Sequence, residues 1–317
     1  MVPGCKLRGA SPNLQRVSSS RPAGCAAVRA ALGEPLVGTA PERAASWLLV
    51  EHPGPWPSDA LPDDLPAEAL GVLEAATQAG VRPQLVRRLR GRRRGAATIV
   101  LASCRAGARW TERRTVTDLR VLADLDVAAL AAGEPPRFGT RAHEPVVLVC
   151  THGRRDVCCA RLGRPLAALL DAQLPGLVWE TTHVGGDRFA PNVVSLPDGS
   201  YHGAVAVADV PALAEAVTTG RLLLPRLRGL AGLHPAAQAA DHYLRLALDE
   251  PRVDVVRVVA TTPAPSGETC VELLGDGVRW CVHVVARTQG ERLTSCAGDG
   301  THGTPASYEL VGLRRLG

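Results

Sequence analysis

The sequence predicts an α/β protein in which a mixed sheet with flanking helices occurs twice and is followed by a small α+β appendix. Three observations predict this fold class. Short apolar runs alternate with helical patterns over residues 47–132, the same order of elements returns over residues 146–217, and strand patterns dominate after residue 250. The chain has 317 residues, of which 46% are hydrophobic and 21% charged, so it can bury more than one core.

The first set of elements begins with a short apolar strand and ends with a helix. Each strand is an apolar or β-branched run, and each helix carries apolar residues three and four positions apart. The expected elements, in the order strand, helix, three strands and helix, are Trp47–Val50, Ala67–Ala79, Gln84–Val86, Thr98–Ala102, Arg109–Val116 and Asp118–Ala132. We therefore expect a first α/β unit that ends near residue 135.

The second set repeats this order. The expected strand, helix, strand, hairpin and helix are Val146–Val149, Ala160–Leu174, Leu177–Glu180, Asn192–Leu196 with Tyr201–Ala206, and Val210–Val217. The turn Pro197-Asp198-Gly199 joins the two hairpin strands. This order of elements is that of the thioredoxin-like topology, so the fold class becomes α/β with tandem thioredoxin-like units.

The two sets and their flanks divide the chain into four segments. We expect a disordered leader over residues 1–24, a degenerate thioredoxin-like unit without metal ligands over 25–135, and a second thioredoxin-like unit over 145–222. Residues 230–317 form the appendix. Its expected elements are one helix and four strands: His234–Leu248, Val253–Val259, Cys270–Leu274, Val278–Ala286 and Tyr308–Leu313.

Charge, apolar runs and cysteine content exclude several classes of function. Four of the five net positive charges lie in residues 1–24, so the rest of the chain is nearly neutral and predicts no nucleic-acid partner. No apolar run approaches the roughly 20 residues that cross a bilayer, which predicts no membrane association. The nine cysteines are an odd number and no apolar signal segment precedes them, so we expect a cytoplasmic protein. In that compartment, clustered cysteines indicate metal or redox chemistry more often than disulfides.

Two motifs carry side chains that bind metals. Cys150-Thr-His-Gly-Arg-Arg-Asp-Val-Cys158-Cys159 and His183-Val-Gly-Gly-Asp187 each follow a strand of the same expected sheet, so their loops converge. Cys158 and Cys159 do not easily face one site, because adjacent helical side chains diverge by about 100°. Glycines between His183 and Asp187 let the backbone turn so that both side chains point inward.

The stretch Cys150–Gly163, with His183–Asn192 and the following hairpin, resembles the sucrase/ferredoxin-like family, whose active portion is a thioredoxin-like [2Fe–2S] ferredoxin. The resemblance is strongest over residues 146–220 and extends more loosely over most of the chain. It implies a [2Fe–2S] cluster held by Cys150, Cys159, His183 and Asp187. Asp187 departs from the two-histidine pattern of some members, so Cys158 is the other candidate for the fourth ligand.

The resemblance implies an electron-transfer protein rather than a catalyst with its own substrate. Its expected partner is a redox protein with an acidic surface. Arg155, Asp156, Arg188 and Cys158 would surround the ligands, and we expect Arg155 to pair with Asp156 and hold the first loop. Imidazole in place of thiolate would make reduction easier.

Two other functions use the same residues. The four ligands are acceptable zinc donors, so a zinc-stabilised binding module without redox activity is the first alternative. A thiol-based redox enzyme is the second. A phosphatase-type loop needs arginine six residues after Cys150, where this chain has Asp156, and no Cys-x-x-Cys motif is present.

The remaining arginines, cysteines and histidines that could have a function are mostly expected to have structural roles. The arginines of residues 87–94 form either a solvated basic loop or a docking site for an acidic partner. Cys104, Cys270 and Cys281 are expected to be small buried hydrophobic residues. His152 either faces the cluster or orders its loop, and His202 is expected to be structural. Cys296 and His302 lie in a glycine-rich surface loop that could also bind a metal. Cys5 and Cys25 have no assigned role.

Overall fold

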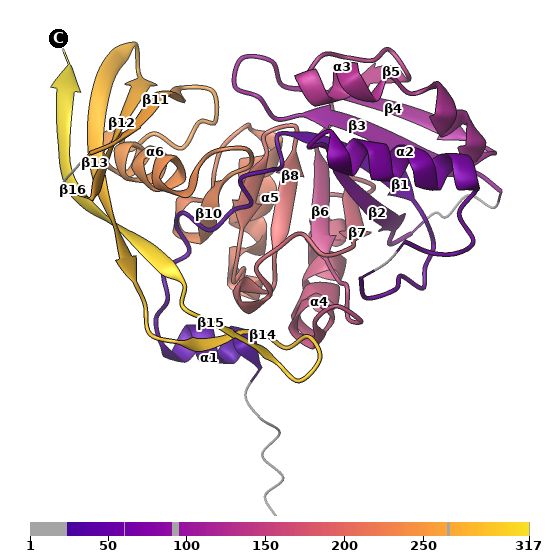
Figure 1. The fold of residues 1–317 in the computed structure, drawn as a ribbon, viewed down its shortest axis with the longest axis horizontal. Helices are drawn as coiled ribbons and strands as arrows, with labels where there is room; N and C mark the ends of the chain where they lie inside the picture. Colours follow the sequence, from indigo (N-terminus) through magenta and orange to yellow (C-terminus); the bar gives the residue numbers. More distant parts are fainter. Residues whose placement is uncertain (1–23, 60, 91–94, 265–266, 317) are drawn as a thin grey trace, which may run out of the picture.

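The computed structural model describes residues 24–59, 61–90, 95–264 and 267–316, so the expected leader lies almost wholly outside the described residues. A ten-stranded mixed sheet forms the centre of the protein (Figure 1). Its strands, in chain order, are β1 Ser46–Glu51, β2 Arg82–Arg88, β3 Ala97–Ser103, β4 Trp110–Val116, β5 Thr140–Ala142, β6 Val146–Cys150, β7 Val178–Thr181, β8 Val193–Leu196, β9 Ser200–His202 and β10 Leu227–Leu230.

The two halves of this sheet have the same pairing. In the first, β1 is parallel to β2 and antiparallel to β3, which pairs with β4. In the second, β6 is parallel to β7 and antiparallel to β8, which pairs with β9. Antiparallel pairing of β2 with β7 joins the halves, and the full order is β10-β9-β8-β6-β7-β2-β1-β3-β4-β5. The predicted α/β class, with its repeated mixed sheet, is confirmed.

The α-helices of the described ranges are α1 Cys25–Ala31, α2 Ala67–Gln78, α3 Val127–Ala132, α4 Val157–Gln173, α5 Val210–Thr218 and α6 Pro235–Leu248. Helices α2 to α5 cover one face of the sheet, whereas α1 lies on the other side and α6 packs on the appendix. Alternate strand residues face opposite sides. Leu48 of β1 packs with α2 and α3, and Val147 of β6 packs with α4 and α5. Trp47 and Leu148 face the other side, where one core runs across both halves.

The appendix packs a four-stranded antiparallel sheet on α6. Its strands are β11 Val256–Pro263, β12 Glu268–Gly275, β13 Val278–Thr288 and β16 Ala306–Leu316. A separate two-stranded ribbon, β14 Arg292–Ser295 with β15 Thr301–Gly303, leaves the appendix and lies beside α1 (Figure 1). The C-terminal part of the chain therefore reaches back to its first described helix. Across the described ranges, every helix is too short or too polar to cross a bilayer.

Two of the expected helices differ from their predicted bounds by more than one residue. The helix expected over residues 118–132 is a 3-10 turn, Leu119–Asp124, followed by α3. Asp118 and Asp126 each cap a separate start, and Leu125 between them is extended. Helix α4 begins at Val157 instead of Ala160, because Asp156 caps it. This earlier start places both cysteines 158 and 159 in the first turn.

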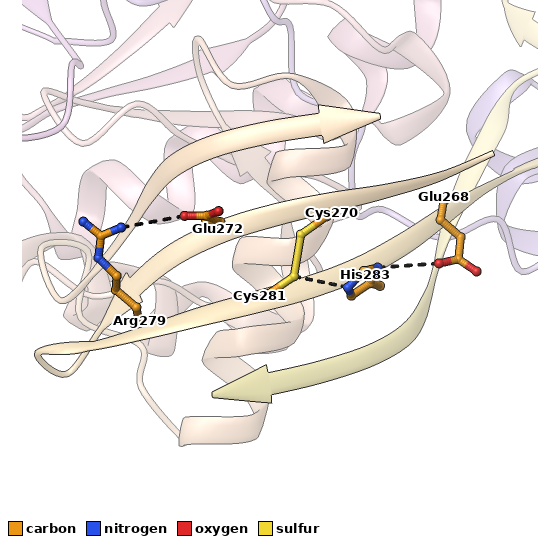
Figure 2. Close-up of a disulfide and its surroundings, with 6 residues drawn as sticks. All are labelled: Glu268, Cys270, Glu272, Arg279, Cys281 and His283. Carbon is orange, nitrogen blue, oxygen red and sulfur yellow. Dashed lines mark hydrogen bonds and ion pairs between the residues drawn. A yellow bond between two sulfur atoms is a disulfide. The ribbon is translucent and has the colours of Figure 1, made fainter. Parts of the chain in front are cut away.

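The interpretation of Cys270 and Cys281 as simple buried hydrophobic residues is wrong. They form a disulfide between the neighbouring strands β12 and β13, with Cα atoms 6.2 Å apart (Figure 2). His283 lies 3.2 Å from the Cys281 sulfur and 3.5 Å from a carboxylate oxygen of Glu268. The register of β12 with β13 makes the two cysteines diagonal neighbours, and the separate strand patterns did not predict this register. Cys104 is buried as expected, and burial raises its pKa to about 12.

Candidate metal centre

Two loops meet at one edge of the central sheet. Strand β6 ends at Cys150 and its parallel neighbour β7 ends at Thr181, and these two residues are in register. Parallel strands place their carboxyl ends at the same edge, so the loops that follow them are neighbours. The ligand atoms of Cys150, Cys159 and His183 lie within 4.8 Å of one another. The structure thus brings together three of the four predicted ligands.

Helix α4 brings the second thiol to the first. Its N-cap, Asp156, accepts a hydrogen bond from the Cys158 amide at 2.7 Å and fixes the first turn. One turn further along, a Cβ atom built on Gly163 would lie only 2.1 Å from the carbonyl oxygen of Cys150. The helix therefore packs directly on the end of β6. Both thiols are buried, with exposed fractions of 0% at Cys150 and 1% at Cys159.

The second loop turns back through its two glycines. Gly185 and Gly186 have φ angles of +95° and +79°, a region that favours glycine. The turn places Asp187 beside His183, with 2.9 Å between a carboxylate oxygen and the ring Nδ1. The same oxygen is 3.5 Å from the Cys159 sulfur. Asp187 therefore lies in contact with His183 and Cys159, beside the three grouped ligand atoms.

Hydrogen bonds among Cys150, Cys159, His183 and Asp187 shift the pKa values of these side chains. The pKa of Cys150 is lowered well below its usual range, because Cys159 donates to its sulfur and His183 lies beside it, although burial opposes this shift. The pKa of Cys159 is raised by that same hydrogen bond and by burial. Burial would lower the pKa of His183, but Asp187 and Cys150 raise it to about 9. These shifts favour an ionised Cys150 thiol beside a protonated His183 imidazole.

The sucrase/ferredoxin-like family matches residues 36–229, which include all four predicted ligands. The chain belongs to the sucrase/ferredoxin-like family. A solved structure of a thioredoxin-like [2Fe–2S] ferredoxin from Aquifex aeolicus is similar at 23% identity, over 27% of this chain and 91% of that one, with a TM-score of 0.24. Among curated proteins no match was found.

The donor set fits a metal group. Thiolate and imidazole ligate both iron–sulfur clusters and zinc, and carboxylate oxygen is a further zinc donor. Burial of the two thiols keeps water from competing for the metal. The residues present in this family member therefore match the chemistry that a bound metal or cluster requires.

The loop of His183 is held by residues that the sequence did not single out. Arg228 on β10 is 1% exposed, and its guanidinium donates at 2.8 Å to the Gly185 carbonyl and to the Asn192 side chain. Burial lowers its pKa to about 10. Arg82 and Gln84, on β2 of the first half, both donate to the carbonyl oxygen of His183 at 3.2 Å. The first half of the sheet thus positions the loop of the second.

His152 orders the loops. Its Nε2 lies 2.7 Å from the Pro57 carbonyl oxygen, and its Nδ1 accepts from the backbone amide of His183 at 3.3 Å. Both ring nitrogens are therefore used between the loops, which decides between the two interpretations of this residue.

The expected pair of Arg155 with Asp156 is wrong. Arg155 pairs with Asp59, while both oxygens of Asp156 are engaged elsewhere, by the start of α4 and by the Cys296 amide. Arg188 pairs with Glu34 at 2.8 Å. Cys158 points away from Cys159, since helix geometry separates neighbouring side chains. Its sulfur lies 3.8 Å from those of Cys25 and Cys296.

The described arginines of the basic run have carboxylate partners. Arg87 and Arg88 belong to strand β2 and lie 2.5 Å from Glu180 and 3.8 Å from Glu51. Arg90 lies 3.2 Å from Asp171. Residues 91–94 lie outside the described residues. The charges at 87, 88 and 90 are therefore largely used within the protein.

Proposed function

We propose that this chain is an electron-transfer protein that binds one [2Fe–2S] cluster through Cys150, Cys159, His183 and Asp187. The observation that supports it is the convergence of two buried thiols and an imidazole, within 4.8 Å, at the ends of adjacent parallel strands. When bound, such a cluster accepts and releases an electron at a potential set by its ligands and surroundings.

The proposed ligands have different roles in holding the cluster and setting its potential. Cys150 and Cys159 supply negative sulfur donors inside the protein. His183 replaces a thiolate with a neutral donor, which lowers the total negative charge and favours the reduced state. Its side chain is 25% exposed, whereas Asp187 is 6% exposed, so the imidazole edge is the member of the group closest to solvent. Electrons would therefore enter and leave beside His183.

A redox partner protein would dock over this edge. His183 opens on a pocket whose wall also includes the apolar side chains Pro57, Leu61 and Leu85. His152 and Arg155 also line this pocket. A partly apolar surface next to the exposed ring allows close approach, and close approach is what electron exchange needs.

Anaerobic purification followed by iron and acid-labile sulfide analysis tests the proposal. We expect two irons and two sulfides per chain and a brown protein. Cys150→Ala and Cys159→Ala should abolish the colour, whereas the matched control Cys104→Ala, a buried thiol outside the group, should keep it. A colourless wild-type protein that loses one zinc on Cys150→Ala would contradict the cluster and favour the zinc-stabilised module.

A further inference from the structure

A second group of metal-binding side chains lies outside the site described above. Cys25 opens α1, Asp156 and Cys158 lie at the start of α4, and Cys296 follows β14. Their donor atoms all lie within 4.8 Å of one another. The sequence separations reach 271 residues, between Cys25 and Cys296, so only the folded chain creates this group. Figure 1 shows how α1 and the β14–β15 ribbon lie together near the start of α4.

The distances match one tetrahedral zinc ion. The Cys25 and Cys296 sulfurs each lie 3.8 Å from that of Cys158, and the Cys25 sulfur lies 3.5 Å from an oxygen of Asp156. With zinc bonds of about 2.3 Å to sulfur and about 2.0 Å to oxygen, a tetrahedral ion spaces two sulfurs by about 3.8 Å and a sulfur and an oxygen by about 3.5 Å. Sulfurs this close cannot each bind a separate iron of a cluster.

Hydrogen bonds from neighbouring backbone and side-chain groups hold the proposed zinc ligands in place. The Cys25 amide donates to the Cys296 sulfur at 3.1 Å, and the Cys296 amide donates to Asp156 at 2.6 Å. The Ser295 hydroxyl donates to the same carboxylate at 3.1 Å. A Cβ atom on Gly24 would lie 2.7 Å from the Cys158 sulfur, so the backbone closes over the group. Such outer contacts orient ligands in metal sites.

We propose that Cys25, Cys158, Cys296 and Asp156 bind one structural Zn²⁺ that ties α1 and the segment after β14 to the start of α4. Four protein donors close the coordination shell, which is typical of structural and not of catalytic zinc. Binding releases the thiol protons to solvent and transfers no electron. The family match over residues 36–229 includes Asp156 and Cys158 but neither Cys25 nor Cys296, so two of the four donors come from outside the matched range.

Zinc analysis of the purified full chain, with X-ray absorption at the zinc edge, tests this site. We expect one zinc per chain with a first shell of three sulfurs and one oxygen. Cys296→Ala should lose the zinc and keep the iron, and Cys150→Ala should lose the iron and keep the zinc. The control Cys104→Ala should keep both.

Three results would overturn the assignment. They are wild-type protein without zinc, a first shell that contains imidazole nitrogen, and a zinc that is lost with Cys150→Ala but kept with Cys296→Ala. The shell is measured on wild-type protein, so the test holds even where a variant fails to fold. Imidazole would place the zinc in another group, because the group of Cys25 contains no histidine.

Discussion

Cys158 and Cys159 are neighbours in the first turn of α4, yet their thiols belong to different groups. The Cys159 sulfur lies 3.5 Å from Asp187, whereas the Cys158 sulfur lies 3.8 Å from both Cys25 and Cys296. An angular step of about 100° per residue produces this division. One helix start therefore supplies a ligand to each of the two proposed metal sites.

Substitution of Asp187 should weaken the cluster site. We expect Asp187→Ala to lose iron to a chelator at least about tenfold faster than wild type, because a donor in contact with His183 and Cys159 is removed. Asp187→His should retain iron, since histidine is a competent ligand for this centre. The measurement is the loss of visible absorbance with time. Equal rates for Asp187→Ala and wild type would place the fourth ligand elsewhere.

His202 should make stability depend on pH. Burial lowers its pKa to about 4, and its Nε2 accepts from the Leu223 amide, so the folded protein holds the neutral ring. A depressed pKa means that the unfolded chain binds the proton first. Stability should be full above about pH 6.5 and fall by about 3 kcal/mol as the pH drops to 4.

Urea unfolding of wild type and His202→Gln between pH 7 and pH 4 measures this effect. In His202→Gln, the part of the fall in unfolding free energy that comes from His202 should disappear. The control His143→Gln, which replaces an exposed histidine, should show the same fall as wild type. An unchanged slope in His202→Gln would show that His202 does not titrate in this way.

At the level of single residues, the sequence predicted the ligands of the candidate centre but not the residues that support them. Cys150, Cys159 and His183 converge as expected, with Asp187 beside His183, because their motifs follow adjacent strands of one sheet. Arg228 and the partners of Cys158 could not be found in this way. They come from distant segments, and local patterns carry no information about such contacts.

Among the helices and strands, the contact of α4 with the end of β6 controls the geometry of the candidate centre. Gly163 is the point of closest approach, and any side chain there meets the Cys150 backbone. Because a backbone carbonyl cannot move aside as a flexible side chain can, the helix itself would have to shift. The spacing between Cys150 and Cys159 depends on that contact.

Two glycine substitutions test the contact. Gly163→Ala should destabilise the protein by about 3 kcal/mol and reduce bound iron, because overpacking against the backbone displaces α4. Gly71→Ala, in an exposed part of α2 with open space around it, should stabilise the protein by about 0.5–1 kcal/mol. Denaturant unfolding and iron analysis measure both. A neutral Gly163→Ala would show that the helix does not pack this closely.

The sequence predicted long apolar elements better than short polar ones. The runs at β1, β3 and β6 are buried along nearly their whole length and were expected with nearly the same bounds. Strand β5 is three residues long and largely exposed, and the β14–β15 ribbon is only partly buried, so neither has a periodic signal. The break at Leu125 was missed because two aspartate caps outweigh a continuous helical pattern.

Across the protein, one sheet and one shared core connect the two halves. Trp47 from the first half and Trp179 from the second lie in the same buried cluster, which spans the junction of β2 with β7. The sequence repeat predicted similar units, and the order of strands repeats accordingly. It did not predict that β2 pairs with β7, because this register joins residues more than 90 positions apart.

This shared core should make the halves unfold together. We expect native-state hydrogen exchange to give the same opening free energy for amides of β1 and β6, within about 0.5 kcal/mol. The ribbon β14–β15, with few buried residues, should open at a lower free energy than either strand. Separate opening of β1 and β6 would show that each half is stable alone.

Nitrogen hyperfine spectroscopy on the reduced protein, grown with isotopically labelled histidine, tests the ligation of the proposed cluster most directly. We expect strong coupling to one bonded histidine nitrogen. His152→Gln should keep that coupling, and His183→Cys should lose it while the cluster stays bound. A wild-type signal without histidine coupling, or a coupling that persists in His183→Cys, would contradict the proposed centre.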